Sequence, residues 1–120
     1  MRNALMIVRI TGIAQILLGV LIWMGQASGL IPSHMLIGVI FVVGLWIVGY
    51  RGVAGGQGVM GAVVLGWGAL VVAFGMIQAQ VMPGPNHAVV QLAHVLMGLL
   101  GMGLGEMLGK KRKPPDAVAG

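Results

Sequence analysis

The sequence predicts an all-α protein, an integral membrane four-helix bundle, and three observations lead to this fold class. Hydrophobic residues make up 58% of the 120 residues and charged residues only 8%, and the mean hydropathy is +1.02. A soluble domain of this length needs far more polar surface. Four apolar stretches have the length of about 20 residues that spans a bilayer. The lysines and arginines all fall on one side of the resulting bundle.

The composition also excludes several kinds of function. There is no cysteine, so disulfides, thiolate metal sites and cysteine nucleophiles are excluded. The net charge of +5 does not indicate nucleic-acid binding, because the basic residues lie at membrane borders and in a short tail rather than among aromatic residues. The 22 glycines and 10 methionines suit close packing of helices in lipid.

The first two transmembrane helices are predicted at residues 4–24 and 32–50. The first stretch is long enough for a full span, so we expect it to remain in the membrane rather than to be cleaved as a signal peptide. The segment GQASGLIP between the two helices contains Gly, Ser and Pro, which break helices. Pro32 suits the first turn of the second helix.

The third and fourth helices are predicted at residues 58–80 and 87–109. The glycine-rich segment RGVAGGQG precedes the third helix, and VMPGPN separates it from the fourth, with Asn86 as a helix cap. Short connections favour antiparallel neighbours, hence a bundle. Residues 1–109 then form a single four-span domain, and residues 110–120 form a basic cytoplasmic tail.

The basic residues predict the orientation of the bundle. They are Arg2, Arg9, Arg51, Lys110, Lys111, Arg112 and Lys113, and four spans place all of them on one side. The two loops on the other side, residues 25–33 and 81–86, contain no Lys or Arg. The positive-inside rule therefore predicts an inner-membrane protein with both termini in the cytoplasm. A bundle this small has little interior, so we expect a homodimer or a subunit of a larger complex.

An internal repeat relates the two halves of the chain. A shift of sixty residues aligns His34 with His94 and Gly38 with Gly98. Spans one and three share a glycine pair spaced by seven residues, although at a different offset: Gly12 and Gly19, and Gly68 and Gly75. This pattern predicts two helix-hairpin repeats related by an axis along the membrane normal. Chance similarity between glycine-rich helices is the alternative.

Two histidines lie inside these apolar segments at equal depth. His34 lies fifteen residues before Gly49, and His94 lies fifteen residues before Gly109. Each of these glycines closes the span that contains the histidine. Both histidines are thus about 22 Å from the cytoplasmic border, in the outer third of a core about 30 Å thick. Two imidazoles at one level on two helices that run in the same direction satisfy the requirement for axial ligation of haem. The predicted metal ligands are therefore His34 and His94.

Four glycines and a third histidine complete the predicted site. Gly38 and Gly98 each follow a ligand by one helical turn and leave space beside it. Gly19 and Gly75 are predicted to do the same on the walls made by spans one and three. His87 is expected about 10 Å further out on the fourth helix, where it would hydrogen-bond a haem propionate or be an exposed first-turn residue.

This arrangement resembles membrane b-type cytochromes, in which paired histidines on separate helices hold haem within a four-helix bundle beside glycines. The resemblance covers the bundle plan and the pair His34 and His94, and it includes no family signature. It implies one or more haem b groups and a non-enzymatic electron carrier that serves a quinone or a periplasmic redox partner. A chlorophyll-type pigment, or structural hydrogen bonding with no cofactor, is the alternative role for the pair.

Two other functions are open. Four spans in this length also resemble small multidrug resistance transporters, which act as dimers and rely on a glutamate in span one. This sequence has Gln15 in that helix, and its acid within a span is Glu106, near the end of span four. We expect Glu106 either to pair with Arg9 or, like Arg9, to reach the interface. The other function is an accessory subunit of a larger membrane complex, docked through the glycine-rich face of span four.

Overall fold

The computed structural model describes residues 1–26 and 28–111. They form the helices α1 (Arg2–Trp23), η1 (Ser28–Leu30), α2 (Ile31–Ala54), α3 (Gly58–Ile77), η2 (Gln78–Gln80) and α4 (His87–Lys111). The two η elements are single 3-10 turns, and η1 continues into α2. Four helical segments are long and apolar enough to cross a membrane. The prediction of an all-helical chain with four such helices is confirmed. Insertion into a bilayer and the side of the termini stay predictions.

Helix boundaries differ from the predicted spans mainly between the second and third helices. α2 continues to Ala54, beyond the predicted end at residue 50. The turn is made by Gly56, whose φ of 89° is a conformation that glycine adopts without steric cost. α4 includes Lys110 and Lys111, which the sequence assigns to the tail. Residues 112–120 of that predicted tail lie outside the described residues.

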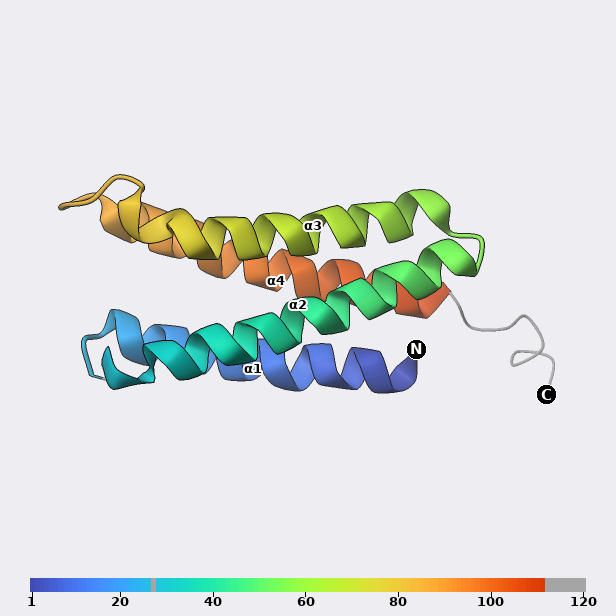
Figure 1. The fold of residues 1–120 in the computed structure, drawn as a ribbon, viewed down its shortest axis with the longest axis horizontal. Helices are drawn as coiled ribbons and strands as arrows, with labels where there is room; N and C mark the ends of the chain where they lie inside the picture. Colours follow the sequence, from blue (N-terminus) through green and yellow to red (C-terminus); the bar gives the residue numbers. More distant parts are fainter. Residues whose placement is uncertain (27, 112–120) are drawn as a thin grey trace.

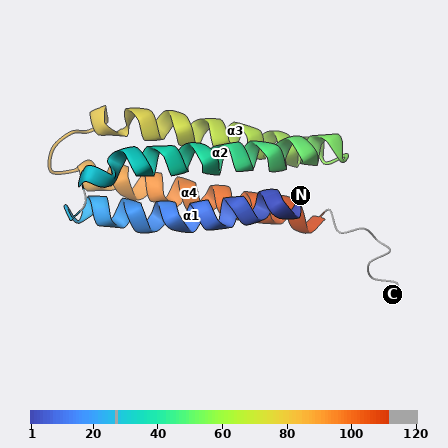
Figure 2. The same ribbon diagram turned by 60° about the horizontal axis from the view of Figure 1, so that its bottom comes forward.

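Helices that are consecutive in the chain run antiparallel, with the start of α1, the turn between α2 and α3 and the end of α4 at one end of the bundle (Figure 1). α2 contacts each of the other three helices. A second view shows the four helices side by side (Figure 2). α2 and α4 contact each other across the bundle, whereas the described parts of α1 and α3 do not. The central pair of the bundle is therefore α2 and α4.

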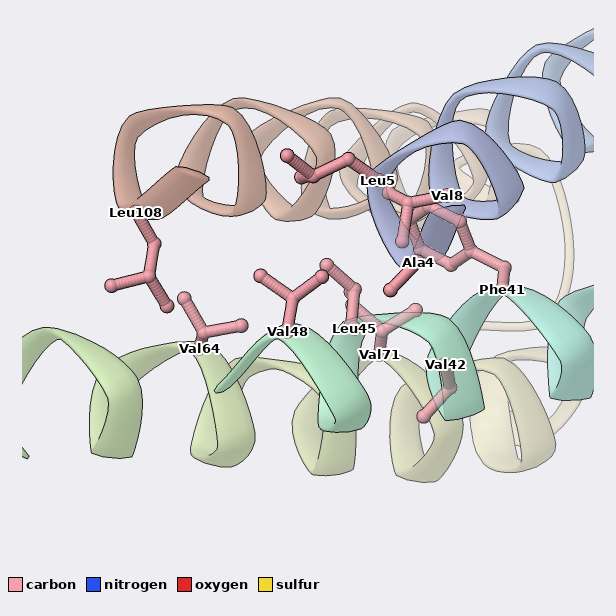
Figure 3. Close-up of a cluster of buried hydrophobic side chains, with 10 residues drawn as sticks. All are labelled: Ala4, Leu5, Val8, Phe41, Val42, Leu45, Val48, Val64, Val71 and Leu108. Atoms are coloured by element: carbon pink, nitrogen blue, oxygen red, sulfur yellow. The ribbon is translucent and has the colours of Figure 1, made fainter. Parts of the chain in front are cut away.

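The buried core consists mainly of small and branched apolar side chains (Figure 3). It consists of Ala4, Leu5, Val8, Phe41, Val42, Leu45, Val48, Val64, Val71 and Leu108. Leu45, Val48, Val64 and Leu108 are completely buried. Many large apolar side chains on the outer faces are exposed, among them Ile10, Leu17, Leu36, Val59 and Leu70. An outer surface of this kind is expected of a bundle that is surrounded by lipid.

Glycines allow α2 and α3 to approach each other closely. A methyl group on Gly61 would lie 2.6 Å from the Gly49 carbonyl oxygen and 2.7 Å from the Val53 amide nitrogen. A methyl group on Gly49 would lie 3.0 Å from the Gly61 carbonyl oxygen. Small residues at a crossing let the backbones of transmembrane helices touch. The hairpin formed by α2 and α3 thus depends on these two glycines.

We expect Gly61→Ala to lower the free energy of unfolding by about 1–3 kcal/mol, because the added methyl group meets backbone atoms that cannot move independently. Gly66→Ala is the matched control on the same helix, since no atom lies within 4 Å of the added group. The control is expected to be neutral or slightly stabilising. Thermal unfolding of both variants in detergent, followed by circular dichroism, measures the difference. Equal shifts in the two variants would contradict the close approach.

Equivalent contacts occur in the two halves of the chain and between them. Residues of α3 correspond to residues of α1 at an offset of 56, and residues of α4 to residues of α2 at an offset of 60. Four contacts made by residues of α1 each have a counterpart made by residues of α3. Gly12–Met102 corresponds to Gly68–Val42, and Gly19–His34 corresponds to Gly75–His94. Leu5–Gly109 corresponds to Gly61–Gly49, and Arg9–Glu106 corresponds to Leu65–Trp46. Positions sixty apart in α2 and α4 also meet directly, as Leu45 does with Gly105. The two hairpins therefore pack against each other through matched positions.

Candidate functional site

The structure brings His34 and His94 together. His34 lies in the first turns of α2, and His94 lies two turns inside α4. Their ring centroids are 6.4 Å apart, and the ring planes make an angle of 67°. Both side chains are half-buried. The two imidazoles are therefore close together in the fold, as the sequence predicted.

The ring nitrogens of both histidines lack hydrogen-bond partners in the described part of the chain. The Nδ1 atoms of His34 and His94 are buried and unpaired. A buried polar atom without a partner costs about 1–3 kcal/mol. Hydrogen bonding to described protein groups thus does not account for the pair. Two unpaired imidazole nitrogens on neighbouring rings are instead suited to bind a group that accepts their lone pairs.

Gly19 and Gly75 make room for the two rings. A methyl group on Gly19 would lie 3.4 Å from Cε1 of His34, and one on Gly75 would lie 3.1 Å from Cε1 of His94. Each glycine belongs to the helix that precedes the histidine-bearing helix in its hairpin. The absence of a side chain therefore lets each ring approach the neighbouring helix closely.

The glycines that follow the histidines differ from each other. A methyl group on Gly38 would lie 2.6 Å from the amide nitrogen of Gln15, whereas no atom lies within 4 Å of one on Gly98. Gln15 lies on α1, one turn before Gly19, and its Oε1 atom is buried without a partner. Gln15 is therefore a polar side chain beside the histidine pair. In the sequence Gln15 stands out only as the residue of span one compared with the glutamate of the transporters, which does not indicate its position near His34.

Phe74 is a second neighbour that sequence reasoning missed. Its ring stacks on the ring of His94, with centroids 5.9 Å apart and planes inclined by 30°. Stacking of this kind holds an imidazole in one orientation. The only signal in the sequence is that Phe74 precedes Gly75, and this does not indicate which way the ring points.

His87 is held by the connection between α3 and α4. Its Nδ1 atom lies 3.2 Å from the carbonyl oxygen of Val81. Seven residues separate it from His94 along α4, which corresponds to about 10 Å. His87 is therefore outside the immediate surroundings of the histidine pair.

The donor set limits which metal sites can form. Among the described residues there is no group of three or more His, Cys, Asp or Glu side chains that could hold a metal ion. His34 and His94 alone supply two nitrogens, whereas protein-bound zinc usually has at least three protein ligands. A metal at this pair would need most of its ligands from a cofactor.

Arg9 and Glu106 form a bidentate ion pair between α1 and α4. Arg9 donates from Nε to Oε1 of Glu106 and from Nη2 to Oε2, the latter over 2.9 Å. The two side chains are 51% and 30% exposed, so the pair is partly accessible. The sequence left open whether Arg9 and Glu106 pair with each other or reach the membrane interface separately, and the structure shows the pair. The carboxylate that the transporter hypothesis would use is thus paired with Arg9 in this structure.

The candidate site thus consists of two histidines from α2 and α4, two glycines that accommodate their rings, and the neighbours Gln15 and Phe74. The fold positions these groups in the half of the bundle opposite the chain's first residues. Comparisons with protein-family models, with curated proteins and with solved structures find no match for this chain.

Proposed function

We propose that this protein is a membrane electron carrier that binds b-type haem between α2 and α4, where His34 and His94 would supply the protein ligands of the iron. The observation that carries the proposal is the approach of two half-buried imidazoles whose Nδ1 atoms are unpaired.

The spacing of the rings fits ligation of one metal ion from opposite sides. A transition metal binds an imidazole nitrogen at about 2 Å, and the ring centroid lies about 1 Å behind that nitrogen, so two such rings have centroids about 6 Å apart. The centroids of His34 and His94 are 6.4 Å apart. The separation of the two rings is therefore compatible with both of them binding one metal ion.

The donor count favours haem over a bare metal ion. A porphyrin brings four nitrogens of its own, so two histidines complete its coordination. When bound, the haem supplies a one-electron iron couple, and the protein supplies ligands, an apolar surrounding and orientation. His34 and His94 would hold the iron, and Gly19 and Gly75 would keep the two rings in place. A chlorophyll-type pigment needs one histidine for each magnesium, so its binding would not require the two histidine rings to be close together.

The matched contacts support a two-fold relation between the hairpins. Counterpart residues of the two halves meet each other across an axis between α2 and α4, as Leu45 and Gly105 do. His34 and His94 occupy such counterpart positions. In the proposed arrangement the two hairpins are repeats, the axis lies along the membrane normal, and both ligands are at the same depth.

The proposed location is the inner membrane, with both termini in the cytoplasm. The described basic residues near helix ends, Arg2, Arg51, Lys110 and Lys111, belong to the end of the bundle where α1 starts and α4 ends. This asymmetry supports the orientation through the positive-inside rule. The haem would then lie nearer the outer surface, where a quinone or a periplasmic protein could exchange electrons with it.

We expect the purified full-length protein, expressed with ample haem, to show a Soret band that shifts on reduction with dithionite. Ligation by two imidazoles is expected to give a low-spin spectrum, with one haem for each histidine pair. Absorption spectra of the oxidised and reduced protein, together with a haem-to-protein ratio, make the measurement. Absence of a Soret band under these conditions would reject the proposed function.

A subunit of a larger complex is the second candidate, and one observation favours it. Among the glycines of α4, Gly103 is exposed and a methyl group on it would meet no atom within 4 Å. Gly101 and Gly105 instead pack against Leu45, and Gly109 packs against Leu5, so these three do not belong to an outward docking face. Glycines that face outward let another transmembrane helix approach closely. Co-purification of the tagged protein from native membranes distinguishes the two, because a stable haem-loaded bundle that purifies alone or as a homodimer supports the independent carrier.

A further inference from the structure

A hollow lies at the end of the bundle where the chain starts, on the side formed by α1 and α2. Its volume is about 430 Å³, and its lining residues are Met1, Arg2, Asn3, Ala4, Ile7, Ile47 and Arg51. At this end of the bundle α2 extends further than α1 in both views of the fold. The difference leaves a step between the two helices (Figures 1 and 2). This hollow is in the opposite half of the bundle from the histidine pair.

Two guanidinium groups at this step lack acidic partners in the described part of the chain. Arg2 begins α1, and Arg51 lies in the last turn of α2. Glu106 is the acidic residue of the described chain, and Arg9 holds it. The first turn of α1 contains no acidic residue either, although the first N–H groups of a helix attract negative charge. The step is therefore a positively charged surface suited to an anion.

The wall of the hollow becomes apolar deeper in the bundle. Ile47 precedes Arg51 by one turn of α2, and Ile7 follows Arg2 by somewhat more than one turn of α1. Since α1 and α2 are antiparallel, both isoleucines lie about 6 to 8 Å further from the end of the bundle than the two arginines. Both isoleucine side chains are exposed. The hollow therefore combines two positively charged arginines at the end of the bundle with an exposed apolar wall beneath them.

We propose that this hollow binds an anionic phospholipid, with the phosphate between Arg2 and Arg51 and an acyl chain against Ile7 and Ile47. Basic pockets at the border of transmembrane helices bind anionic headgroups. Arginine is suited to this role because its planar guanidinium group binds phosphate oxygens in pairs. The proposal depends on the membrane placement of the bundle and is independent of haem.

The test uses purified, delipidated full-length protein in a non-ionic detergent. A short-chain phosphatidylglycerol is titrated by calorimetry and compared with a phosphatidylcholine of the same chain length and with inorganic phosphate. We expect saturable binding of phosphatidylglycerol, weakened about fivefold by Arg51→Gln and by Arg2→Gln. Lys110→Gln is the matched control, because Lys110 lies at the same end of the bundle but does not line the hollow. Its effect is expected to be less than about twofold.

The source of the phosphate is distinguished by a second variant. Ile47→Gln is expected to weaken binding of phosphatidylglycerol and to leave binding of inorganic phosphate unchanged. Inorganic phosphate that binds as tightly as the lipid would show a free-anion site and overturn the lipid proposal. Equal losses in Arg51→Gln and Lys110→Gln, or equal affinity for phosphatidylcholine, would also overturn it. Circular dichroism of each variant confirms that the helices are intact.

Discussion

Replacement of His94 by alanine is expected to remove the Soret band from protein expressed with ample haem. The proposed haem has two protein ligands, and loss of either leaves an iron position open and one helix unattached. Mutation of residues that merely orient a metal ligand already costs about 10- to 100-fold in affinity. Loss of the ligand itself should cost at least as much. Absorption spectra normalised to protein concentration measure the occupancy.

His34→Ala should have the same effect, because the two rings are counterparts in the two hairpins. His87→Ala is the matched control. It removes a histidine from the same helix as His94, but one whose Nδ1 atom is beside the Val81 carbonyl oxygen. Its spectrum is expected to be unchanged. Haem that binds equally well to all three variants would contradict the ligand assignment.

A conservative variant separates ligation from a structural role of His94. His94→Met is expected to keep the haem and to raise its reduction potential, because ligation by histidine and methionine favours the reduced iron. A potentiometric titration of the purified variant measures the change. A histidine that only fills space between α2 and α4 would give a variant with an unchanged potential.

The sequence predicted the number of helices and the meeting of the two histidines, for physical reasons that can be named. A span of about 20 apolar residues is required by the bilayer, so span length needs no knowledge of packing. His34 and His94 lie at equal distances from the glycine that closes each span. Equal rise along helices of the same direction therefore places them at one level, as their 6.4 Å separation requires.

The rotation of each helix about its axis could not be predicted. In a soluble helix the apolar stripe shows which face is inside, but a transmembrane helix is apolar on all faces. The stacking of Phe74 on His94 and the position of Gln15 beside Gly38 both depend on this rotation. For the same reason the sequence left open whether Arg9 and Glu106 face each other, and the ion pair became visible only in the fold.

The end of α2 shows a different limit. The segment RGVAGGQG has the composition of a turn, yet its first four residues belong to the helix. In a helix hairpin that packs closely, glycine serves both as a helix breaker and as a contact residue, and composition does not distinguish the two uses. Arg51 consequently lies on the last turn of α2, where it faces the first turn of α1.

The second large effect is expected from Gly75→Leu, which should reduce haem occupancy by about tenfold or more. A first side-chain carbon at this position would lie 3.1 Å from Cε1 and 3.6 Å from Nε2 of His94. The longer leucine side chain has to displace the imidazole, and overpacking of this kind costs about 1–3 kcal/mol. Displacement of the ring would disturb the ligand that His94 would supply, so the loss should fall on haem binding rather than on helix formation.

Gly66→Leu on the same helix is the matched control, because Gly66 is exposed and no atom lies within 4 Å of an added methyl group. We expect unchanged haem occupancy in this variant. The smaller Gly75→Ala should give an intermediate loss, and Gly19→Leu should reproduce the effect at His34 through the counterpart contact. Haem spectra and circular dichroism of all four variants measure ligation and helicity separately. If Gly75→Leu and Gly66→Leu retain the same haem content, the ring of His94 is not held against α3 in the haem-bound protein, and the proposed site has to be placed elsewhere.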